Sequence, residues 1–398
     1  MLLQFTVENF ASFRDEATLN LLANIQKEHS DSLIEKNGVR ELASIAIFGP
    51  NAGGKSNLFK ALASSINFIR FSNARQINDV SPYIIPFLMD NIHPKMPSSF
   101  YFVFLKNGLK YEYGFKADQK TVHEEFLYVY KTQKRTLIFE RKNINKYIFP
   151  TATKKELEPF VKMTDSNKLF LSSATAWNAK ETRDAYLFFA NDIDVYDSQF
   201  LEQNLYATLD TNKDPSLPAF MSKLLKAADI NISGYSFETG NSFVPGMKQM
   251  RILTKHQISV DGGAEEYQFD LQNESNGTKR LFAYGPIIKR ALENGKTVFV
   301  DEMDNCLHPS LCRYLISLFQ NHETNPHGAQ LIFNTQDISL LDLSLFRRDQ
   351  IYFVDKKNDT GVSDLYSLDD FSVRKNDLIQ KGYLLGRFGA LPNIYVDA

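Results

Sequence analysis

The residues Gly49-Pro-Asn-Ala-Gly-Gly-Lys55-Ser56 decide the fold, because they match the pattern G-x-x-x-x-G-K-[ST] in full. Glycines in such a loop let successive backbone N–H groups converge on a phosphate, and a helix that begins near Lys55 adds its positive end. We expect Lys55 to reach the β- and γ-phosphates of a nucleotide and the Ser56 hydroxyl to bind Mg²⁺. The predicted nucleotide contacts are Asn51, Gly53, Gly54, Lys55, Ser56 and Asn57.

The segments on either side of this loop have the patterns that a P-loop requires. Residues 43–48 are a short, mostly apolar run that is typical of a buried strand. After the loop, residues 57–70 have the spacing of an amphipathic helix, with one apolar face made of Leu58, Ala61, Leu62, Ile66 and Ile69. Strand, loop and helix in this order predict an α/β nucleotide-binding core.

A second motif, Thr297-Val-Phe-Val-Asp301-Glu302, is an apolar strand that ends in two acidic residues. We expect Asp301 to hold the water shell of Mg²⁺ and Glu302 to polarise the attacking water. Alone this motif is weak, since ordinary strands also end in acids, but together with a P-loop it becomes specific. A compact Ras-like core needs far fewer than the 246 positions that separate Lys55 from Asp301, so we expect an insertion between the two halves of the core.

The pattern of strands and helices divides the chain into three predicted parts. Residues 1–98 form the N-terminal half of the core with the P-loop, residues 99–230 a mixed β-hairpin and helical insertion, and residues 231–398 the C-terminal half. Asn107-Gly108 lies between two aromatic runs and predicts a β-hairpin turn. The predicted fold is an α/β P-loop core with a mixed sheet and flanking helices. No heptad run of useful length occurs, which excludes long coiled-coil arms.

The last third of the chain alternates between helix and strand patterns. We predict helices at 276–294 and 309–321, and strands at 297–301, 330–334 and 350–354.

Composition limits the classes of partner. The net charge is −2, from 45 basic and 47 acidic residues, so only a local patch could contact nucleic acid. A basic stretch over residues 131–155 is by default a solvated face, with contact to nucleic acid or a partner as the alternative. We expect the 32 Phe and 18 Tyr to fill cores rather than stack on bases.

Cysteine content and hydropathy predict the compartment. Cys306 and Cys312 cannot build a disulfide framework or a zinc site, which favours a reducing cytoplasm. We expect neither a signal peptide nor a membrane span, because no apolar run approaches about 18 residues.

Four motifs in a fixed order carry a family resemblance. They are Asn9-Phe-Ala-Ser-Phe13, the P-loop continued to Leu58, Glu274-Ser-Asn-Gly-Thr-Lys-Arg-Leu281, and Asp301-Glu-Met-Asp-Asn-Cys-Leu-His-Pro309. The chain resembles the stand-alone ABC/SMC-type ATPases of the AAA family found in bacterial abortive-infection and restriction-linked loci (AbiLi-like, RloA-like), relatives of the RecF and OLD ATPases. The resemblance covers nearly the whole chain.

The resemblance implies a role for Ser275-Asn276-Gly277 as the ABC signature loop. A Ser hydroxyl and a Gly amide at a helix start make a second anion site. One chain cannot use both anion sites on one nucleotide, so the resemblance implies a head-to-tail dimer with ATP at the joint. Asp304 would then touch the partner subunit. The alternative is that Ser275 simply caps the helix that begins at Asn276.

Three positions depart from the pattern of that family. Gln336 follows the strand at 330–334 where relatives usually carry His; it can hydrogen-bond a γ-phosphate or water but cannot become cationic. We therefore place Gln336 with Lys55 and Glu302 in the catalytic set and expect slow hydrolysis or γ-phosphate sensing. Ala11 stands where relatives often carry a basic residue, and Leu169–Ala174, the candidate Q-loop, contains no glutamine.

The leading functional hypothesis is an ATPase that dimerises on ATP and controls a separately encoded effector. The family resemblance implies a Toprim- or RloB-like nuclease or a toxin as that effector, in anti-phage defence. Two alternatives stay open: a slow-turnover, nucleotide-gated sensor that holds a toxin or nuclease inactive, and a RecF-like DNA-repair ATPase. A transporter subunit is disfavoured, because the insertion is rich in hairpins. His308 and His123 are expected to be structural rather than metal ligands.

Overall fold

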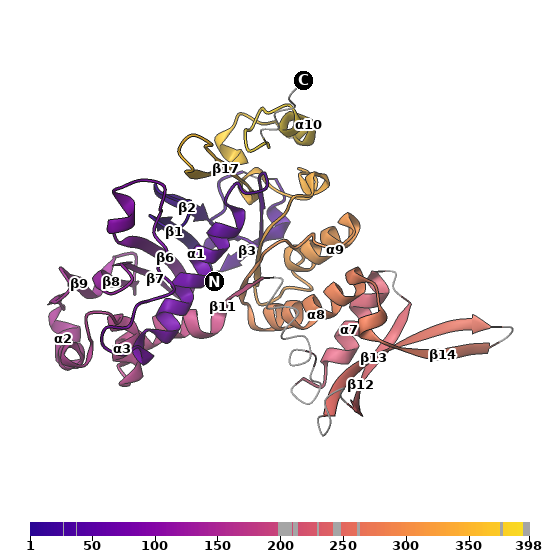
Figure 1. Cartoon of the computed structure of the whole chain (residues 1–398), viewed down its shortest axis with the longest axis horizontal. Helices are drawn as coiled ribbons and strands as arrows, with labels where there is room; N and C mark the ends of the chain where they lie inside the picture. Colours follow the sequence, from indigo (N-terminus) through magenta and orange to yellow (C-terminus); the bar gives the residue numbers. More distant parts are fainter. Residues whose placement is uncertain are drawn as a thin grey trace.

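The computed structural model describes residues 1–26, 28–36, 38–197, 209, 214–228, 231–241, 248–260, 263–374 and 377–392. Two large sheets and a projecting three-stranded sheet organise this part of the chain (Figure 1).

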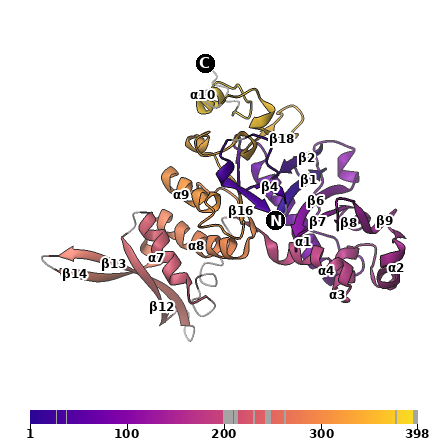
Figure 2. The same cartoon turned by 180° about the vertical axis from the view of Figure 1, so that it is seen from behind.

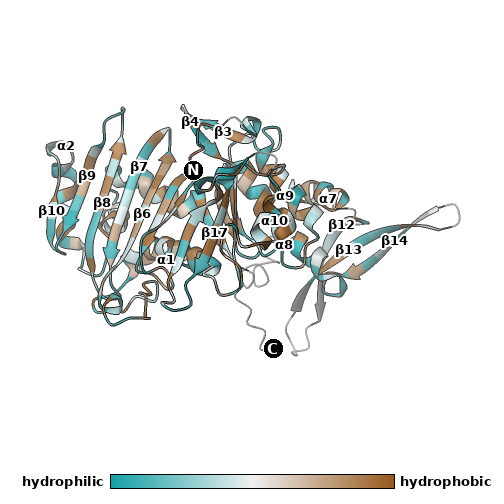
Figure 3. Ribbon diagram, turned by 90° about the horizontal axis from the view of Figure 1, so that it is seen from above, coloured by the Kyte–Doolittle hydropathy of each residue, from teal (hydrophilic) through white to brown (hydrophobic). Residues whose placement is uncertain are grey.

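The first sheet is antiparallel, with the strand order β10-β9-β8-β7-β6-β1-β2. The Asn107-Gly108 turn joins β6 to β7 with positive φ at both residues, so the predicted hairpin is confirmed. Figure 3 shows hydrophilic and hydrophobic bands along these strands, as expected for a sheet with one buried face. Its strands are β1 (Leu2–Glu8), β2 (Ala17–Asn20), β6 (Ser98–Lys106), β7 (Leu109–Ala117), β8 (Val122–Tyr130), β9 (Thr136–Lys142) and β10 (Lys146–Ile148).

The second sheet contains the P-loop strand. Its order is β11-β15-β16-β5-β17-β18, and all neighbours are parallel except β17 and β18. Because β16 lies between β5 and β15, the P-loop and the acidic strand end meet across it at one edge of the sheet. The strands are β11 (Ile193–Tyr196), β15 (Thr297–Val300), β16 (Gln330–Asn334), β5 (Ser44–Phe48), β17 (Ile351–Lys356) and β18 (Ser363–Ser367).

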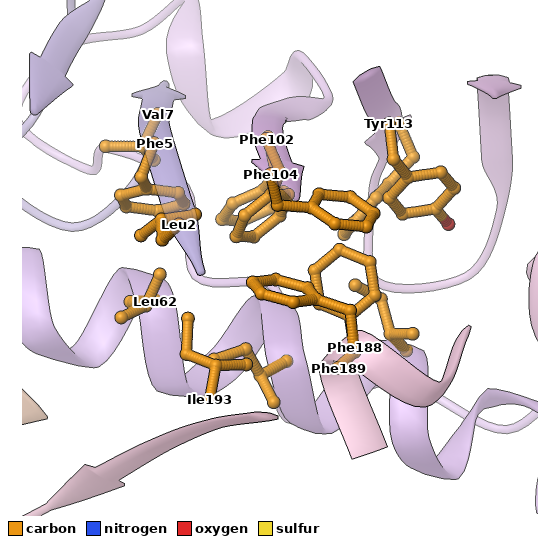
Figure 4. Close-up of a cluster of buried hydrophobic side chains, with 14 of the residues drawn as sticks. Leu2, Phe5, Val7, Leu62, Phe102, Phe104, Tyr113, Phe188, Phe189 and Ile193 are labelled. Carbon is orange, nitrogen blue, oxygen red and sulfur yellow. The ribbon is translucent and has the colours of Figure 1, made fainter. Parts of the chain in front are cut away.

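Helix α1 (Lys55–Phe71) packs between the two sheets and provides much of the larger core. Figure 4 shows Leu62 of α1 facing side chains of β1 and β6, with Phe188 and Phe189 closing the cluster. The rings of Phe104 and Phe188 stack at 4.2 Å. These aromatic side chains fill the core, as the composition predicts.

The other face of the second sheet is covered by helices of the last third of the chain. They are α8 (Asn276–Asn294), α9 (Pro309–Gln320) and α10 (Ile379–Leu384). The predicted helices at 276–294 and 309–321 are therefore confirmed, the second to within one residue. Outside the three-stranded sheet, the structure also contains α2 (Thr151–Leu157), α3 (Phe170–Ala176), α4 (Lys180–Leu187), α7 (Leu217–Ala227), β3 (Leu33–Lys36) and β4 (Val39–Leu42).

The third sheet, here called the arm, consists of β12 (Ile232–Asn241), β13 (Lys248–Val260) and β14 (Gly263–Asp270). The β13–β14 hairpin projects from the body in views from both sides (Figures 1 and 2). Its base is anchored on α8, where the Tyr235 and Phe282 rings meet edge to face at 5.6 Å. Helix α7 supports the same region, because it packs on β12 and α8.

The predicted boundary between residues 98 and 99 falls at the start of β6, which pairs with β1. Residues on both sides of this boundary therefore share one sheet, since strand pairing is non-local. The three-part division stays a prediction in other respects, and residues 198–208, 210–213 and 229–230 lie outside the described part. Among the described helices the longest, α8, has 19 residues, which agrees with the predicted lack of a long coiled coil. None of them is long and apolar enough to cross a membrane.

Candidate nucleotide-binding site

The P-loop joins the fully buried strand β5 to the first residue of α1, Lys55. Two of its glycines have no room for a side chain. A Cβ on Gly49 would lie 2.3 Å from the Val354 carbonyl oxygen, and one on Gly54 would lie 2.4 Å from Oγ of Ser363. Gly54 also has φ of 116°, which L side chains rarely adopt. Sterics therefore explain why the loop needs glycine at these positions.

A chain of hydroxyl groups supports the P-loop from behind. The Asn57 side-chain amide donates to Ser12 Oγ at 2.9 Å, and Ser12 Oγ lies 2.8 Å from Ser363 Oγ. Ser363 in turn donates to the Gly53 carbonyl at 2.7 Å. The Asn9-Phe-Ala-Ser-Phe13 motif thus contributes Ser12 to the backing of the loop. Nothing in the sequence spacing indicates this role, because Ser12 and Ser363 are 351 residues apart.

Lys55 is buried within its own loop. Its Nζ donates to the carbonyl oxygens of Gly49 at 2.7 Å and Pro50 at 3.0 Å. Burial lowers the pKa of Lys55, and the nearby carboxylates of Asp304, Asp301 and Glu302 oppose that shift. The ammonium group therefore lies at the centre of the loop and within the field of the acidic strand end.

Ser56 and Asp301, the two predicted metal ligands, are brought together. Ser56 Oγ donates to Asp301 Oδ1 at 3.2 Å. Hydroxyl and carboxylate oxygens are ligands that Mg²⁺ prefers, so this donor set fits a magnesium ion.

Asn334, at the end of β16, forms hydrogen bonds with both acidic residues. Its side-chain amide donates to Asp301 Oδ1, and its side-chain oxygen accepts from the Glu302 backbone N–H at 2.7 Å. Asn334 is fully buried. The sequence places Asn334 only as the last residue of a strand; its role depends on β16 lying beside β15, which spacing does not show.

Glu302 and Gln336 complete one pocket with the P-loop. This pocket has a volume of about 420 Å³ and is lined by residues 50–57 together with these two side chains. Glu302 has φ of 52°, in the left-handed region, which places its side chain by a turn that non-glycine residues seldom adopt. The Gln336 backbone N–H donates to Asp304 Oδ2 at 3.2 Å. The predicted catalytic residues Lys55, Glu302 and Gln336 therefore converge.

The predicted signature residues lie elsewhere. Ser275 caps α8, because its Oγ accepts from the Thr278 N–H at 3.1 Å. This cap does not decide between the two interpretations, so the signature role stays a prediction. Gly277 packs against the loop that follows Glu302, where an added Cβ would lie 2.9 Å from the Cys306 carbonyl oxygen. None of Ser275, Asn276 and Gly277 lines the P-loop pocket of the same chain.

The candidate Q-loop, Leu169–Ala174, is the buried start of α3 and does not line the P-loop pocket. The carboxylate of Glu125 accepts from the N–H groups of Phe170 at 2.6 Å and Leu171 at 2.9 Å. Glu125 thus has a structural role, because its carboxylate caps the start of α3.

His308 likewise caps α9, accepting from the Ser310 N–H. Within the described residues, no cluster of three His, Cys, Asp or Glu could hold a metal ion.

The basic stretch is largely paired within the chain. Arg141 is buried and donates to three backbone carbonyls. Four further basic residues of the stretch form ion pairs, which are Arg135–Glu112, Lys142–Glu140, Lys154–Glu158 and Lys131–Glu181. The stretch therefore matches a solvated, internally paired face better than a nucleic-acid patch.

The P-loop, the acidic strand end two strands away and the antiparallel sheet define an ABC-type P-loop nucleotide-binding protein. A family model described as "AAA domain, putative AbiEii toxin, Type IV TA system" matches residues 44–342, which is most of the chain. The chain belongs to this family.

Two solved structures of SMC heads are similar to the chain. One is the head bound to the C-winged helix domain of ScpA, with 14% identity, coverage of 92% of this chain and 97% of that chain, and a TM-score of 0.41. The other is a head with an extended coiled coil bound to the C-terminal domain of ScpA, from Pyrococcus furiosus, with 12% identity, coverage of 97% and 98%, and a TM-score of 0.45. A search of curated proteins finds no match.

Proposed function

We propose that the chain is an ABC-type ATPase that binds ATP with Mg²⁺ at the P-loop pocket and hydrolyses it to ADP and phosphate. The observation that carries this proposal is the convergence of residues 50–57, Glu302 and Gln336 on one pocket. Lys55 and the loop amides bind the β- and γ-phosphates. Ser56 and Asp301 hold the Mg²⁺, which neutralises phosphate charge when bound. Glu302 orients the attacking water, and Gln336 contacts that water or the γ-phosphate.

The second anion site supports a dimer. Ser275, Asn276 and Gly277 present a hydroxyl group and amides at a helix start, yet they do not line the pocket of their own chain. Two chains arranged head to tail would complete each P-loop pocket with the partner's Ser275. Under this proposal ATP is part of the interface, so dimerisation depends on nucleotide.

The dimer controls a separately encoded effector in anti-phage, abortive-infection defence. The description of the matched AAA domain family as a putative AbiEii toxin of a type IV toxin–antitoxin system supports the defence setting, and the separate effector follows from the family resemblance. A Toprim- or RloB-like nuclease or another toxin fits the role of effector. A cytoplasmic location accords with the two free thiols, exposed Cys306 and buried Cys312.

Gln336 favours a second candidate, a nucleotide-gated sensor with slow turnover. A neutral amide beside Glu302 cannot supply the positive charge that a histidinium would offer to the γ-phosphate. In this candidate the ATP-bound dimer itself is the signal, and hydrolysis only resets it.

Two variants, compared with the wild type, test these proposals. Lys55→Ala should abolish binding of a fluorescent ATP analogue, whereas Glu302→Gln should bind it, dimerise and release no phosphate. Phosphate release by the wild type that exceeds that of Glu302→Gln would support the ATPase. Equal, background release with retained ATP-dependent dimerisation would favour the sensor. Tight Mg·ATP binding by Lys55→Ala would contradict both.

A further inference from the structure

The arm is connected directly to the signature loop. β14 ends at Asp270, the short 3₁₀ turn Leu271–Asn273 follows, and Glu274 then precedes Ser275, the cap of α8. Asp270 fixes this connection, because its carboxylate accepts from the Gln272 N–H at 2.9 Å. The last arm strand is therefore joined to the second anion site by a short connection with little conformational freedom.

A second connection runs through the side chain of Glu274. Its Oε1 accepts from Thr254 Oγ1 at 2.6 Å and lies 2.7 Å from Nε2 of His256, both in the central arm strand β13. Because a carboxylate oxygen only accepts, His256 donates in this pair. The Thr254 side chain is fully buried, and those of His256 and Glu274 are 20% and 13% exposed. Sheltered, charge-assisted hydrogen bonds are stronger than exposed ones, so this contact holds Glu274 firmly.

The first turn of α8 is fixed on its other side by the Cys306 carbonyl, which leaves Gly277 no room for a Cβ. Ser275 and Gly277 thus lie between the arm and the loop that follows Glu302. A shift of β13 relative to the body would move Glu274 and with it the hydroxyl group of Ser275.

We infer that Glu274 is the positioning residue of the second anion site, and that the arm sets the place of Ser275–Gly277 against the partner's nucleotide through Thr254 and His256. This inference rests on the proposed head-to-tail dimer. It assigns the arm a function in trans. A chain with a displaced arm keeps its own P-loop intact, but its Ser275–Gly277 no longer completes the ATP site at the P-loop of its partner.

A purely structural role of Glu274 would have different consequences. A carboxylate at a helix start stabilises α8 through the helix dipole. Its loss would then lower the free energy of unfolding and affect turnover only as far as the protein unfolds. Readouts other than stability are therefore needed.

The first experiment compares three full-length variants. Glu274→Ala should lower kcat about 10- to 100-fold, since small displacements of positioning groups have effects of this size. Its affinity for a fluorescent ATP analogue in the monomer should change less than about twofold, because the P-loop is untouched. Glu274→Gln keeps an acceptor for Thr254 and His256 and should restore most turnover. Lys255→Ala is the matched control: Lys255 lies between Thr254 and His256 but pairs with Glu266 on the opposite face of the arm.

The second experiment tests action in trans by mixing variants. A dimer of Lys55→Ala with Glu274→Ala carries both defects in one ATP site and leaves the other intact. An equal mixture should regain about a quarter of wild-type turnover, because half of randomly formed dimers are mixed and each has one working site. A mixture of Lys55→Ala with Ser275→Ala is the reference for the composite site itself.

Each outcome of the two experiments either supports or overturns the inference. Recovery in both mixtures supports the inference. Recovery only in the Ser275→Ala mixture, or wild-type kcat in Glu274→Ala, overturns the positioning role while the proposed dimer stands. Recovery in neither mixture, with each variant inactive alone, refutes the composite site and with it the proposed dimeric function. Turnover by Glu274→Gln as low as that of Glu274→Ala would also overturn the role assigned to the Thr254 and His256 contacts.

Discussion

Replacing Asn334 by alanine should separate ATP binding from hydrolysis. The Asn334 side chain accepts from the Glu302 N–H at 2.7 Å and donates to Asp301 Oδ1, so its removal frees both acidic residues at once. Glu302 is in a left-handed conformation that only its surroundings enforce. Without Asn334 the backbone at Glu302 can relax to a more common conformation, which would move the Glu302 carboxylate away from the attacking water. We expect kcat to fall about 10²-fold, the usual size for loss of one preorganising group.

Stability and binding should change much less. Asn334 is fully buried, and leaving the Glu302 amide unpaired costs about 1–3 kcal/mol of unfolding free energy. Lys55 and the loop amides keep their positions, so the Kd for ATP should rise less than about threefold. Phosphate release, titration with a fluorescent ATP analogue and chemical denaturation measure the three quantities separately.

Asn325→Ala provides a matched control. Asn325 is also buried and bonds the backbone at Phe319 and Ala329, beyond the opposite end of β16. Its loss should lower stability by a similar amount and leave kcat unchanged in the fraction that is folded. The reasoning would be refuted if both asparagine variants lost turnover equally, or if Asn334→Ala lost ATP affinity in proportion to kcat.

Other predictions concern strain, sterics and pH. Both Glu302→Gly and Glu302→Gln should abolish turnover. The free energy of unfolding should be up to about 1 kcal/mol higher for Glu302→Gly, because only glycine adopts φ of 52° without strain. Equal stability of the two variants would contradict this prediction. Gly54→Ala should lose ATP binding, whereas Gly38→Ala, with positive φ but open space around it, should cost only stability; similar ATP affinity of the two variants would count against the steric argument. Desolvation raises the pKa of Glu41 from 4.5 to about 7, so the folded state holds this proton more tightly than the unfolded one. The contribution of Glu41 to stability is therefore present below pH 4.5 and lost as pH rises through about 7. Glu41→Gln should remove that loss, worth up to about 3 kcal/mol at pH 8, as denaturation at several pH values would show.

Local patterns predict the parts of the site that are contiguous in sequence. Strand, loop and helix around Lys55 follow each other within 30 residues, so periodicity and glycine spacing are sufficient to place them. The strand that ends at Asp301 is equally local. What brings Ser56 to Asp301 is the order of strands in the sheet, and sequence supplies it only through the family resemblance.

The supporting groups could not be predicted, because they are joined by non-local contacts. Ser12 supports the P-loop only because β18 starts beside it with Ser363. Glu125 caps α3 across 45 residues of sequence, which turns the candidate Q-loop at 169–174 into a buried helix start. Strand pairing likewise places β6 beside β1, across a predicted boundary. Each of these contacts is set by tertiary packing rather than by propensity.

The loop from Asp301 to His308 links two sites that, in the proposed dimer, act on different nucleotides. At one end Glu302 faces the pocket of its own chain. At the other end the Cys306 carbonyl lies against Gly277, whose helix would contact the partner's ATP. Cys306 has φ of 65° and Glu302 has φ of 52°, so the loop is held in an uncommon backbone shape at both ends. Release of that shape after hydrolysis at one site would displace Gly277 and weaken the other site. Coupling between the two sites would then appear as a departure from the quarter of wild-type turnover that independent sites give in the mixed dimers. The arm, acting through Glu274, is placed to bias both sites.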